Sequence, residues 1–316
     1  MKVVTVNSGS SSIKYGVYNA DDCSLIASGL LEKVGSAETR LRQKRITKEG
    51  TFETREISRP VADHWEGFEL IMKANADDRI VKDKSELFGI GHRVVHGGEL
   101  FSNPTLIDDK GISAIRKLIP LAPLHNPHNL LGIEVIRKSF PDVHQVAIFD
   151  TAFHQTLPPY SFHYALPYKF YTEHSVRRYG FHGTSHLYVA KRAAGHLGKP
   201  LQEVNLITLH LGNGASAAAI QNGKCIDTSM GLTPLEGLIM GTRCGDIDPA
   251  VHFYLMRQTG MSAGEIEKLL NFQSGLEGIC GTNDMRQIQQ KAEAGDEQAM
   301  LALDMFCYRA KKYIGA

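Results

Sequence analysis

The stretch VVTVNSGSSSIKYGVY at residues 3–18 is matched by a second stretch, LITLHLGNGASAAAIQ, at residues 206–221. A shift of 203 positions (212 − 9) places Gly9 on Gly212, and the same shift places Val17 on Ile220. Each stretch is an apolar run, a short loop of Gly, Ser and Asn, and a second apolar run. This order is typical of a β-hairpin with a small tip. The sequence therefore predicts one such hairpin in each half of the chain.

The two loop tips are candidate phosphate sites, because small residues let backbone N–H groups wrap a bound anion. A single loop of this kind is more often a plain turn. Neither loop fits the Walker pattern or the dinucleotide fingerprint, since a strand and not a helix follows it. The duplication is what favours phosphate binding. We expect two domains that hold the polyphosphate of a nucleotide between them, with Ser10 and Ser12 in the first phosphate loop.

The 316 residues are enough for two domains with separate cores. A hydrophobic share of 42% and a charged share of 22% are those of a soluble globular protein. The net charge is +1 and basic residues are spread along the chain, which argues against a nucleic-acid partner. No apolar stretch reaches the length of a membrane span, and the N-terminus enters a strand without a signal-peptide pattern. Five scattered cysteines without a CxxC motif favour a cytoplasmic location.

Strands followed by helices in both halves predict a duplicated α/β architecture, with domains at residues 1–150 and 151–316. Asn126 and Pro127 fit a helix start, because Asn can accept free N–H groups and Pro is tolerated at the first helical position. In the first half we expect strands at residues 25–31, 88–95 and 143–149, and helices at residues 60–74, 108–119 and 126–140. Residues 40–58 are polar and weakly alternating, which suits either exposed strands or an excursion. In the second half we expect helices at residues 184–197 and from Asp248, Ser262 and about Asp296 onward.

Four segments place charged or imidazole side chains beside glycine or proline, where apolar packing does not explain them. They are GHRVVHGG (91–98), LHNP (124–127), RRYGFHGTSH (177–186) and MGTRCGDIDP (240–249). An arginine in such a segment can present its planar fork to a phosphate or carboxylate. Asp150 follows a buried strand, where α/β folds place ligands, although it also fits a turn cap.

Two other chemistries fit the sequence less well. His92/His96 and His182/His186 have the i, i+4 spacing of helical zinc pairs. Glycines and strand-like runs surround the first pair, the helix is expected to begin after the first His of the second, and neither pair has the HExxH pattern. Serine nucleophile chemistry is disfavoured because no GxSxG elbow is present.

These motifs resemble those of the acetate kinase family, within the superfamily of acetate and sugar kinases, heat-shock chaperone ATPases and actin. The matching segments are NSGSSSIK, GHRVVHGG, LAPLHNP, FDTAFHQT, RRYGFHGTSH, HLGNGAS, DTSMGLTPLEG and MGTRCGDIDP, spread over residues 7–249. The resemblance implies an α/β fold of duplicated ribonuclease-H-like domains, the actin-like ATPase fold, with an interdomain cleft. It implies reversible phosphoryl transfer from ATP to acetate, giving acetyl phosphate and ADP, with Mg²⁺ or Mn²⁺. It also implies a homodimer.

The resemblance also implies roles for individual residues. The catalytic positions fall on Asp150, His182, Arg243 and His125. The resemblance implies that Arg93 binds the acetate carboxylate. It also implies an apolar pocket for the methyl group, formed by Val95, Leu124, Phe181 and Pro234. The nucleotide positions fall on Lys14, His210, Leu211, Gly212, Asn213, Gly214, Asp284, Met285 and Arg286. Asn7 would help to hold the metal.

Elementary chemistry agrees with these roles. A simple carboxylic acid has a pKa of ~4–5, as Glu does, so acetate is already ionised at neutral pH and needs no general base. The obstacle is the approach of an anion to a charged nucleotide, which calls for positioning and cations around the transferred group. We therefore favour an orienting or metal-shell role for Asp150 over proton abstraction.

Two departures from the family and three alternative functions accompany this interpretation. Cys244 stands where the family usually has serine, a change that we expect to be tolerated. The chain ends where the family continues with a Gly-rich adenosine-binding segment and a metal-binding glutamate, so a catalytically impaired fragment is one expectation. A propionate or butyrate kinase is a second, because one methylene is worth only ~1–3 kcal/mol in an apolar pocket. A nucleotide-driven binding module would use the same loops without the acid-binding residues.

Overall fold

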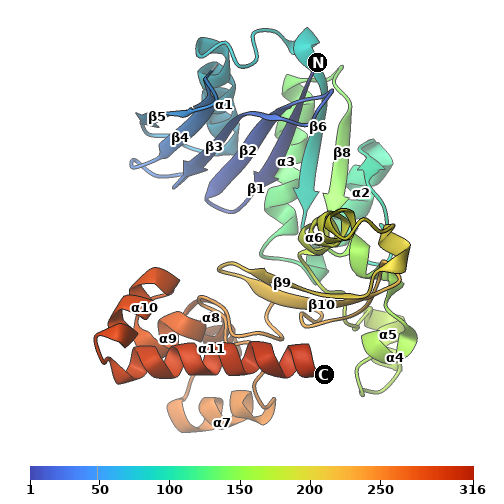
Figure 1. Cartoon of the computed structure of the whole chain (residues 1–316), viewed down its shortest axis with the longest axis vertical. Coiled ribbons are helices and arrows are strands. Elements are labelled where there is room, and N and C mark those ends of the chain that lie inside the picture. The colour runs from blue at the N-terminus through green and yellow to red at the C-terminus, as the bar shows by residue number, and fades with distance from the viewer. Residues whose placement is uncertain (48) are drawn as a thin grey trace. The chain divides into compact units, whose positions relative to one another are not determined.

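The computed structural model describes residues 1–47 and 49–316. The chain divides into two compact units, an N-terminal unit, Met1–Ala152, and a C-terminal unit, Phe153–Ala316 (Figure 1). The division lies two residues after the boundary that we placed at Asp150. In the part of the chain that the structure describes, no helix has the length and apolar character needed to cross a bilayer.

The N-terminal unit is built on an eight-stranded mixed sheet with the order β5-β4-β3-β2-β1-β6-β8-β7. Strand β1 pairs antiparallel with β2 and parallel with β6, which in turn pairs parallel with β8. The carboxyl ends of β1, β6 and β8 therefore meet at one edge of the sheet, the edge at which α/β proteins bind ligands. The strands are β1 Lys2–Ser8, β2 Ser12–Asn19, β3 Leu25–Glu32, β4 Arg40–Ile46, β5 Phe52–Ser58, β6 Leu87–Val94, β7 Thr105–Leu106 and β8 Gln145–Phe149.

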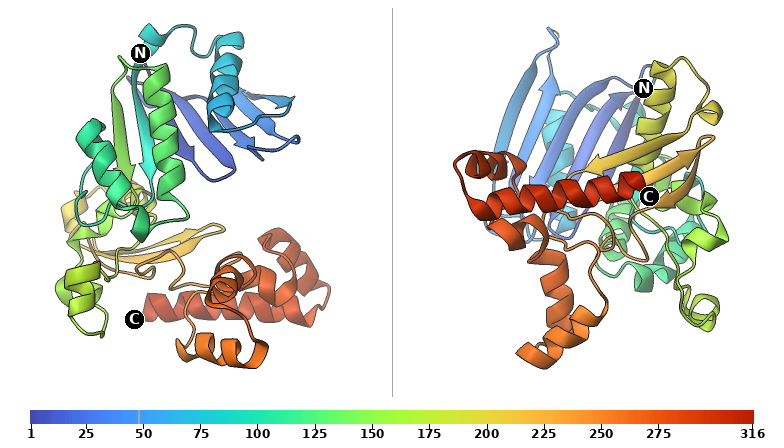
Figure 2. Two further views of the ribbon diagram at one scale, coloured as in Figure 1. Left: turned by 180° about the vertical axis from the view of Figure 1, so that it is seen from behind. Right: turned by 60° about the horizontal axis from the view of Figure 1, so that its bottom comes forward.

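Helices α1 and α3 lie side by side on one face of this sheet (Figure 2, left). The alternation of β1 explains why, since Val6 points into the core beneath them while Thr5 on the other face is exposed. The helices of this unit are α1 His64–Asp77, α2 Asp109–Lys117 and α3 Asn126–Ser139, with short 3₁₀ turns η1 Lys84–Glu86 and η2 Ile119–Leu121. A further turn, η3 Ala152–Thr156, spans the division between the units.

The prediction that Asn126 caps α3 is wrong. The cap position is His125, and no side chain bonds to the helix start there. Asn126 is fully buried, and its amide pairs instead with the backbone of His96, accepting from its N–H at 3.1 Å and donating to its carbonyl at 3.0 Å. The backbone of the segment after β6 forms hydrogen bonds with side chains rather than with a neighbouring strand, and Asn126 supplies two of them in place of capping the helix.

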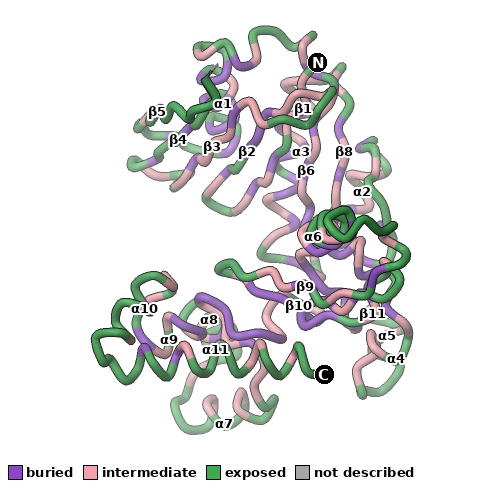
Figure 3. The backbone as a smooth tube through the Cα atoms, viewed as in Figure 1, coloured by how far each residue is buried: buried purple, intermediate pink, exposed green. Residues whose placement is uncertain are grey.

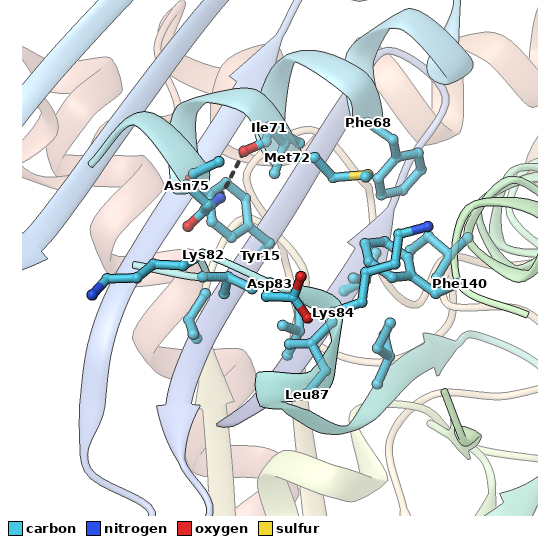
Figure 4. Close-up of a pocket in the computed structure, with 17 residues that line it drawn as sticks. Tyr15, Phe68, Ile71, Met72, Asn75, Lys82, Asp83, Lys84, Leu87 and Phe140 are labelled. Atoms are coloured by element: carbon cyan, nitrogen blue, oxygen red, sulfur yellow. Dashed lines mark hydrogen bonds between the residues drawn. The ribbon is translucent and has the colours of Figure 1, made fainter. Parts of the chain in front are cut away.

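A cavity of about 330 Å³ lies in the core of the N-terminal unit, between β1, β2 and β6 and the two helices (Figure 4). Its walls are mostly apolar and include Val6, Phe68 and Phe140. Asn75 also lines it, and its amide donates to the carbonyl of Ile71 at 2.7 Å. None of the residues that we predicted to carry chemistry lines this cavity, so it is separate from the candidate site.

The C-terminal unit contains a three-stranded antiparallel sheet of order β11-β10-β9, namely β9 Leu206–Leu211, β10 Ala215–Gln221 and β11 Lys224–Thr228. Central strand β10 is buried along nearly its whole length (Figure 3). The helix α6 Gly183–His196 packs against β9. The other helices are α4 Pro159–Phe162, α5 Lys169–His174, α7 Ala250–Thr259, α8 Ala263–Phe272, α9 Gly275–Cys280, α10 Met285–Glu293 and α11 Glu297–Gly315, with a 3₁₀ turn η4 Leu201–Glu203.

Both predicted hairpins are present, but their loops differ in length. Ser8 pairs with Ile13, so residues 9–12 form the first loop, whereas Leu211 pairs with Ala215, so residues 212–214 form the second. The first strands keep the shift of 203, and the second strands follow a shift of 202. Placing Val17 on Ile220 is therefore wrong by one residue, because a sequence overlay cannot see a deletion inside a loop of similar small residues.

Candidate active site

The first loop begins at the carboxyl end of β1. The N–H of Gly9 donates to the carbonyl of Ser12 at 2.8 Å, and the Nε2 of His64 lies 2.7 Å from the carbonyl oxygen of Gly9. These contacts close the loop and tie it to α1, while Ser10 at its tip is exposed. The loop is thus a fixed tip with an accessible backbone, as an anion cradle requires.

Asn7 and Lys14 stand opposite one another on β1 and β2. Cross-strand partners share one face of a sheet, and this is the face that α1 and α3 leave uncovered. Lys14 is exposed and Asn7 is half-buried. An ammonium group and an amide oxygen therefore flank the first loop on its accessible side.

Arg93 and Asp150 form an ion pair at the ends of β6 and β8. The Nε of Arg93 donates to Oδ1 of Asp150 at 2.9 Å, and its Nη2 donates to Oδ2. The Asp150 side chain is 3% exposed and that of Arg93 is 40% exposed. Burial opposes the charge on Arg93, but the Asp150 carboxylate outweighs it and raises the pKa of the guanidinium. One face of Arg93 thus stays open to solvent while the carboxylate fixes its direction.

Asn129 of α3 joins the first loop to the segment after β6. Its amide donates to the carbonyl of Ser8 at 2.8 Å and accepts from the N–H of Val95 at 2.9 Å. Val95 is 8% exposed, whereas Leu124, just before α3, is 47% exposed. One buried side chain therefore holds both the residue before the predicted phosphate loop and a residue of the predicted acid pocket.

In the C-terminal unit, His182, His210 and Arg243 gather at the second loop. The rings of His182 and His210 stack with centroids 4.0 Å apart. A β-carbon on Gly214 would lie 3.3 Å from Nε2 of His182 and 3.2 Å from Nη1 of Arg243. Any larger residue would crowd the ends of these two side chains, so both lie close to the backbone of the loop. Arg243 also donates to the carbonyl of Pro234 at 3.3 Å.

His182 holds an unusual backbone conformation, with φ of 58° and ψ of 21° at the residue preceding α6. A left-handed conformation is strained for any residue with a β-carbon. Such strain is stored where the surrounding structure enforces it, and it is found often at functional sites.

The tip of the second loop is held by two neighbouring segments. The carbonyl of Asn213 accepts from the N–H of Gly241 at 2.9 Å, and its side-chain oxygen lies 3.3 Å from Nδ2 of Asn283. Asp284 then caps α10 by accepting from the N–H of Arg286 at 3.0 Å. Its hydrogen bonds with the Arg286 side chain lower the pKa of Asp284 to about 2. Asp284 therefore has a structural task in addition to the nucleotide role that the sequence suggested.

Comparison with known proteins identifies the family of this chain. Residues 2–316 match the Acetokinase family. The chain belongs to this family. An acetate kinase of Syntrophobacter fumaroxidans is 59% identical, over all of this chain and 77% of that protein. The chain is accordingly a carboxylate kinase with ATP and ADP as co-substrates.

Solved structures of acetokinase-family members share the fold. The crystal structure of Porphyromonas gingivalis acetate kinase matches with a TM-score of 0.93 and 45% identity, over 99% of this chain and 78% of that one. A propionate kinase from Francisella tularensis matches with a TM-score of 0.92 and 42% identity, over 99% of this chain and 79% of that one. The predicted α/β class and actin-like ATPase fold are thereby confirmed.

The predicted acetokinase site residues fall into two groups, one in each unit. The N-terminal unit carries Asn7, Ser10, Ser12, Lys14, Arg93, Val95, Leu124, His125 and Asp150. The C-terminal unit carries Phe181, His182, His210, Leu211, Gly212, Asn213, Gly214, Pro234, Arg243, Asp284, Met285 and Arg286. Phe181 is only 1% exposed, so it forms part of the core of its unit. Cys244 Sγ lies 3.1 Å from the carbonyl of Gly245, a contact that the family's serine could also make.

The sequence did not reveal the side chains that hydrogen-bond to the candidate site residues and to the two loops. Asn129, His64 and Asn283 make the contacts described above, and Ser216 bonds to His182. Ser216 lies inside the quoted HLGNGAS motif, so its place in the motif was the available signal. His186 was considered only as a zinc ligand. Within residues 1–47 and 49–316, no three His, Cys, Asp or Glu side chains gather as a metal cluster would require.

Proposed function

We propose that this protein transfers the γ-phosphoryl group of ATP to acetate, reversibly, giving acetyl phosphate and ADP by direct in-line transfer. The observation that carries the proposal is the approach of His182 and Arg243 to Gly214 in the second glycine loop. Two donors beside an anion-binding loop are what a transferring phosphoryl group needs. The names of the related proteins support acetate as the acceptor.

Arg93 is the proposed ligand of the acetate carboxylate. Its guanidinium can offer a planar fork of N–H donors to a second carboxylate while Asp150 holds it in place. Because acetate is already anionic at neutral pH, no group has to remove a proton from it. Asp150 therefore orients Arg93, and it does not act as a base.

His182 and Arg243 are the proposed donors to the equatorial oxygens of the phosphoryl group, with His125 as a further catalytic group. Lys14, Ser10 and Ser12 bind phosphates from the first loop, and residues 210–214 and 284–286 bind the nucleotide. Donors that are fixed before the reaction stabilise the developing charge without reorganisation. They should therefore act on the rate constant more than on substrate affinity.

Mg²⁺ is the proposed metal, with Mn²⁺ as a substitute. Mg²⁺ usually takes one or two carboxylate or amide oxygens together with substrate phosphates. The amide oxygen of half-buried Asn7, near the end of β1, and the carboxylate of Asp150, just after β8, fit that donor chemistry, and the parallel strand β6 lies between these two strands. When bound, the metal would neutralise phosphate charge, while Asn7 and Asp150 hold it.

Acetate is proposed over propionate because the related proteins at 59% and 54% identity are named acetate kinases. The residues proposed from the family resemblance to receive the methyl group are Val95, Leu124, Phe181 and Pro234. The related propionate kinase makes the longer acid a genuine competitor. The cytoplasm is the proposed location, since none of the five cysteines, all within the described residues, forms a disulfide. A homodimer is proposed by analogy with the family.

The test is acetate-dependent formation of ADP by the purified protein with Mg²⁺ and ATP, compared with propionate and with no acid. We expect kcat/KM for acetate to exceed that for propionate by about 10-fold, the discrimination available from one methylene. ATP hydrolysis that is indifferent to the acid would instead favour a nucleotide-driven binding module. A preference for propionate would reassign the acceptor and leave the kinase chemistry in place.

A further inference from the structure

Three buried side chains, Ser216, His186 and Thr208, form a line of hydrogen bonds that ends at His182. Nδ1 of His182 lies 2.9 Å from Oγ of Ser216, and the same oxygen lies 2.8 Å from Nε2 of His186. Nδ1 of His186 lies 2.8 Å from Oγ1 of Thr208. Ser216, His186 and Thr208 are 0%, 1% and 3% exposed. The line connects the start of α6 with β10 and β9, and all of it belongs to the C-terminal unit.

Proton counting restricts how this line can be arranged. The hydroxyl of Ser216 has one proton and touches two ring nitrogens, so it donates to one ring and accepts from the other. Burial favours a neutral His186, which has one N–H and one lone pair for its two hydroxyl partners. Two arrangements remain. Either every donor points toward His182, or every donor points away from it.

Thr208 decides between the two arrangements. If the donors pointed away from His182, the Thr208 hydroxyl would accept from His186 and its own proton would need a further acceptor. Among the hydrogen bonds of the described residues, the Thr208 side chain contacts only His186. A buried hydroxyl proton without an acceptor is costly. The donors therefore point toward His182, from Thr208 to His186, from His186 Nε2 to Ser216, and from Ser216 to Nδ1 of His182.

We propose that Ser216 and His186 are positioning residues that keep the proton of neutral His182 on Nε2. That nitrogen is the one directed toward Gly214, where Arg243 also approaches. A neutral N–H donor has an advantage there, because an imidazolium would stand beside the Arg243 guanidinium. The other titratable rings nearby are His210, stacked on His182, and His154, whose ring meets the edge of His186 with centroids 5.8 Å apart. The role of this His182 tautomer in catalysis rests on the proposed function, phosphoryl transfer.

The direct test is imidazole ¹⁵N NMR on the purified protein, with the His182 signals assigned through His182→Gln. We expect the pattern of an Nε2–H tautomer at pH 8 in the wild type and a mixture of tautomers in Ser216→Ala. This readout needs no activity, so it stays informative even if acetate is not the acceptor. An Nδ1–H tautomer in the wild type, or no change in Ser216→Ala, overturns the proposal.

Kinetics supply the second test. In Ser216→Ala, His182 would need to be charged in order to donate reliably from Nε2. We therefore expect kcat to fall roughly tenfold at pH 8 and to recover as the pH falls toward ~6.5, the ordinary imidazole pKa. The acetate KM should change less than twofold. His186→Gln can keep both hydrogen bonds, so it should retain several times more activity than His186→Leu.

Ser229→Ala is the matched control, because Ser229 is also a fully buried serine hydroxyl and it accepts from the N–H of Ala217 on β10 at 2.9 Å. A purely structural role for Ser216 would give the two alanine variants the same loss and the same pH profile. That result would contradict the proposal, whereas a pH-dependent loss in Ser216→Ala alone supports it.

Discussion

Nε of Arg93 and Oδ1 of Asp150 lie 2.9 Å apart, in a two-point ion pair that joins the ends of two parallel strands. The carboxylate is buried and the guanidinium is partly exposed, so removing the arginine leaves a buried charge without its partner. We expect Arg93→Ala to lower the free energy of unfolding by about 1–3 kcal/mol and to raise the acetate KM at least ~10-fold. Urea denaturation and steady-state kinetics measure the two effects. Arg93→Ala/Asp150→Ala should regain stability without regaining acetate binding, and a double variant no more stable than Arg93→Ala would contradict the pairing.

Arg243→Ala should act on turnover. Because its guanidinium is proposed to meet charge that develops during transfer, we expect kcat to fall about 10³-fold while the acetate KM changes less than about threefold. Arg257→Ala, at an exposed position on α7, controls for loss of a positive charge. A change in KM alone would remove Arg243 from the catalytic group.

Asn129→Ala should disturb two distant segments together. Its amide makes one bond to Ser8 and one to Val95, and each is worth about 1 kcal/mol when both partners are buried. We expect a loss of about 2 kcal/mol in unfolding free energy and higher KM values for both ATP and acetate. Substrate titrations of the variant check this. An effect on one substrate only would show that the two segments do not depend on each other.

The buried side chain of His92 should make the stability of the protein depend on pH. Burial lowers the pKa of His92 to about 4, against 6.5 in the unfolded chain. Between pH 6.5 and pH 4 the His92 ring is protonated in the unfolded state and neutral in the folded state. The free energy of unfolding therefore decreases as the pH falls from 6.5 toward 4. Replacing His92 with Gln, which can still donate to Gln145, should make the pH slope shallower by about 1.4 kcal/mol per unit. Urea denaturation at several pH values measures the slope.

Thiol reactivity should follow burial. Burial raises the pKa of Cys225 to about 12 and also raises the pKa of Cys244, so both hold less thiolate near neutral pH. Exposed Cys23 and Cys307 should therefore react first with iodoacetamide at pH 7.5, Cys244 more slowly, and Cys225 only after unfolding. Mass spectrometry of peptides from a time course gives the order. Rapid labelling of Cys244 would mean that its surroundings are more open than described.

Local patterns were sufficient for the long elements of this fold and insufficient for side-chain partners. The hairpins, the helix over 126–140 and the strand before Asp150 follow from periodicity and turn residues, which act within a few positions. The short helices α4, α5 and α9 were not predicted, because four to six residues are too few to show a helical period. The nine-residue α10 was also missed. Asn126 shows the same limit, since its choice between a helix cap and His96 depends on a segment thirty residues away. Ser216 and Asn129 were missed for that reason as well.

The left-handed backbone at His182 has an evolutionary consequence. Any side chain with a β-carbon is held there at a penalty of roughly 1–2 kcal/mol, and His182→Gly would release it. A directed-evolution campaign that rewards heat tolerance alone would therefore be drawn toward glycine at this position and would discard turnover in the process. Because His182 is also a proposed donor to the phosphoryl group, heat tolerance and turnover would compete at this one residue, so selections should score both.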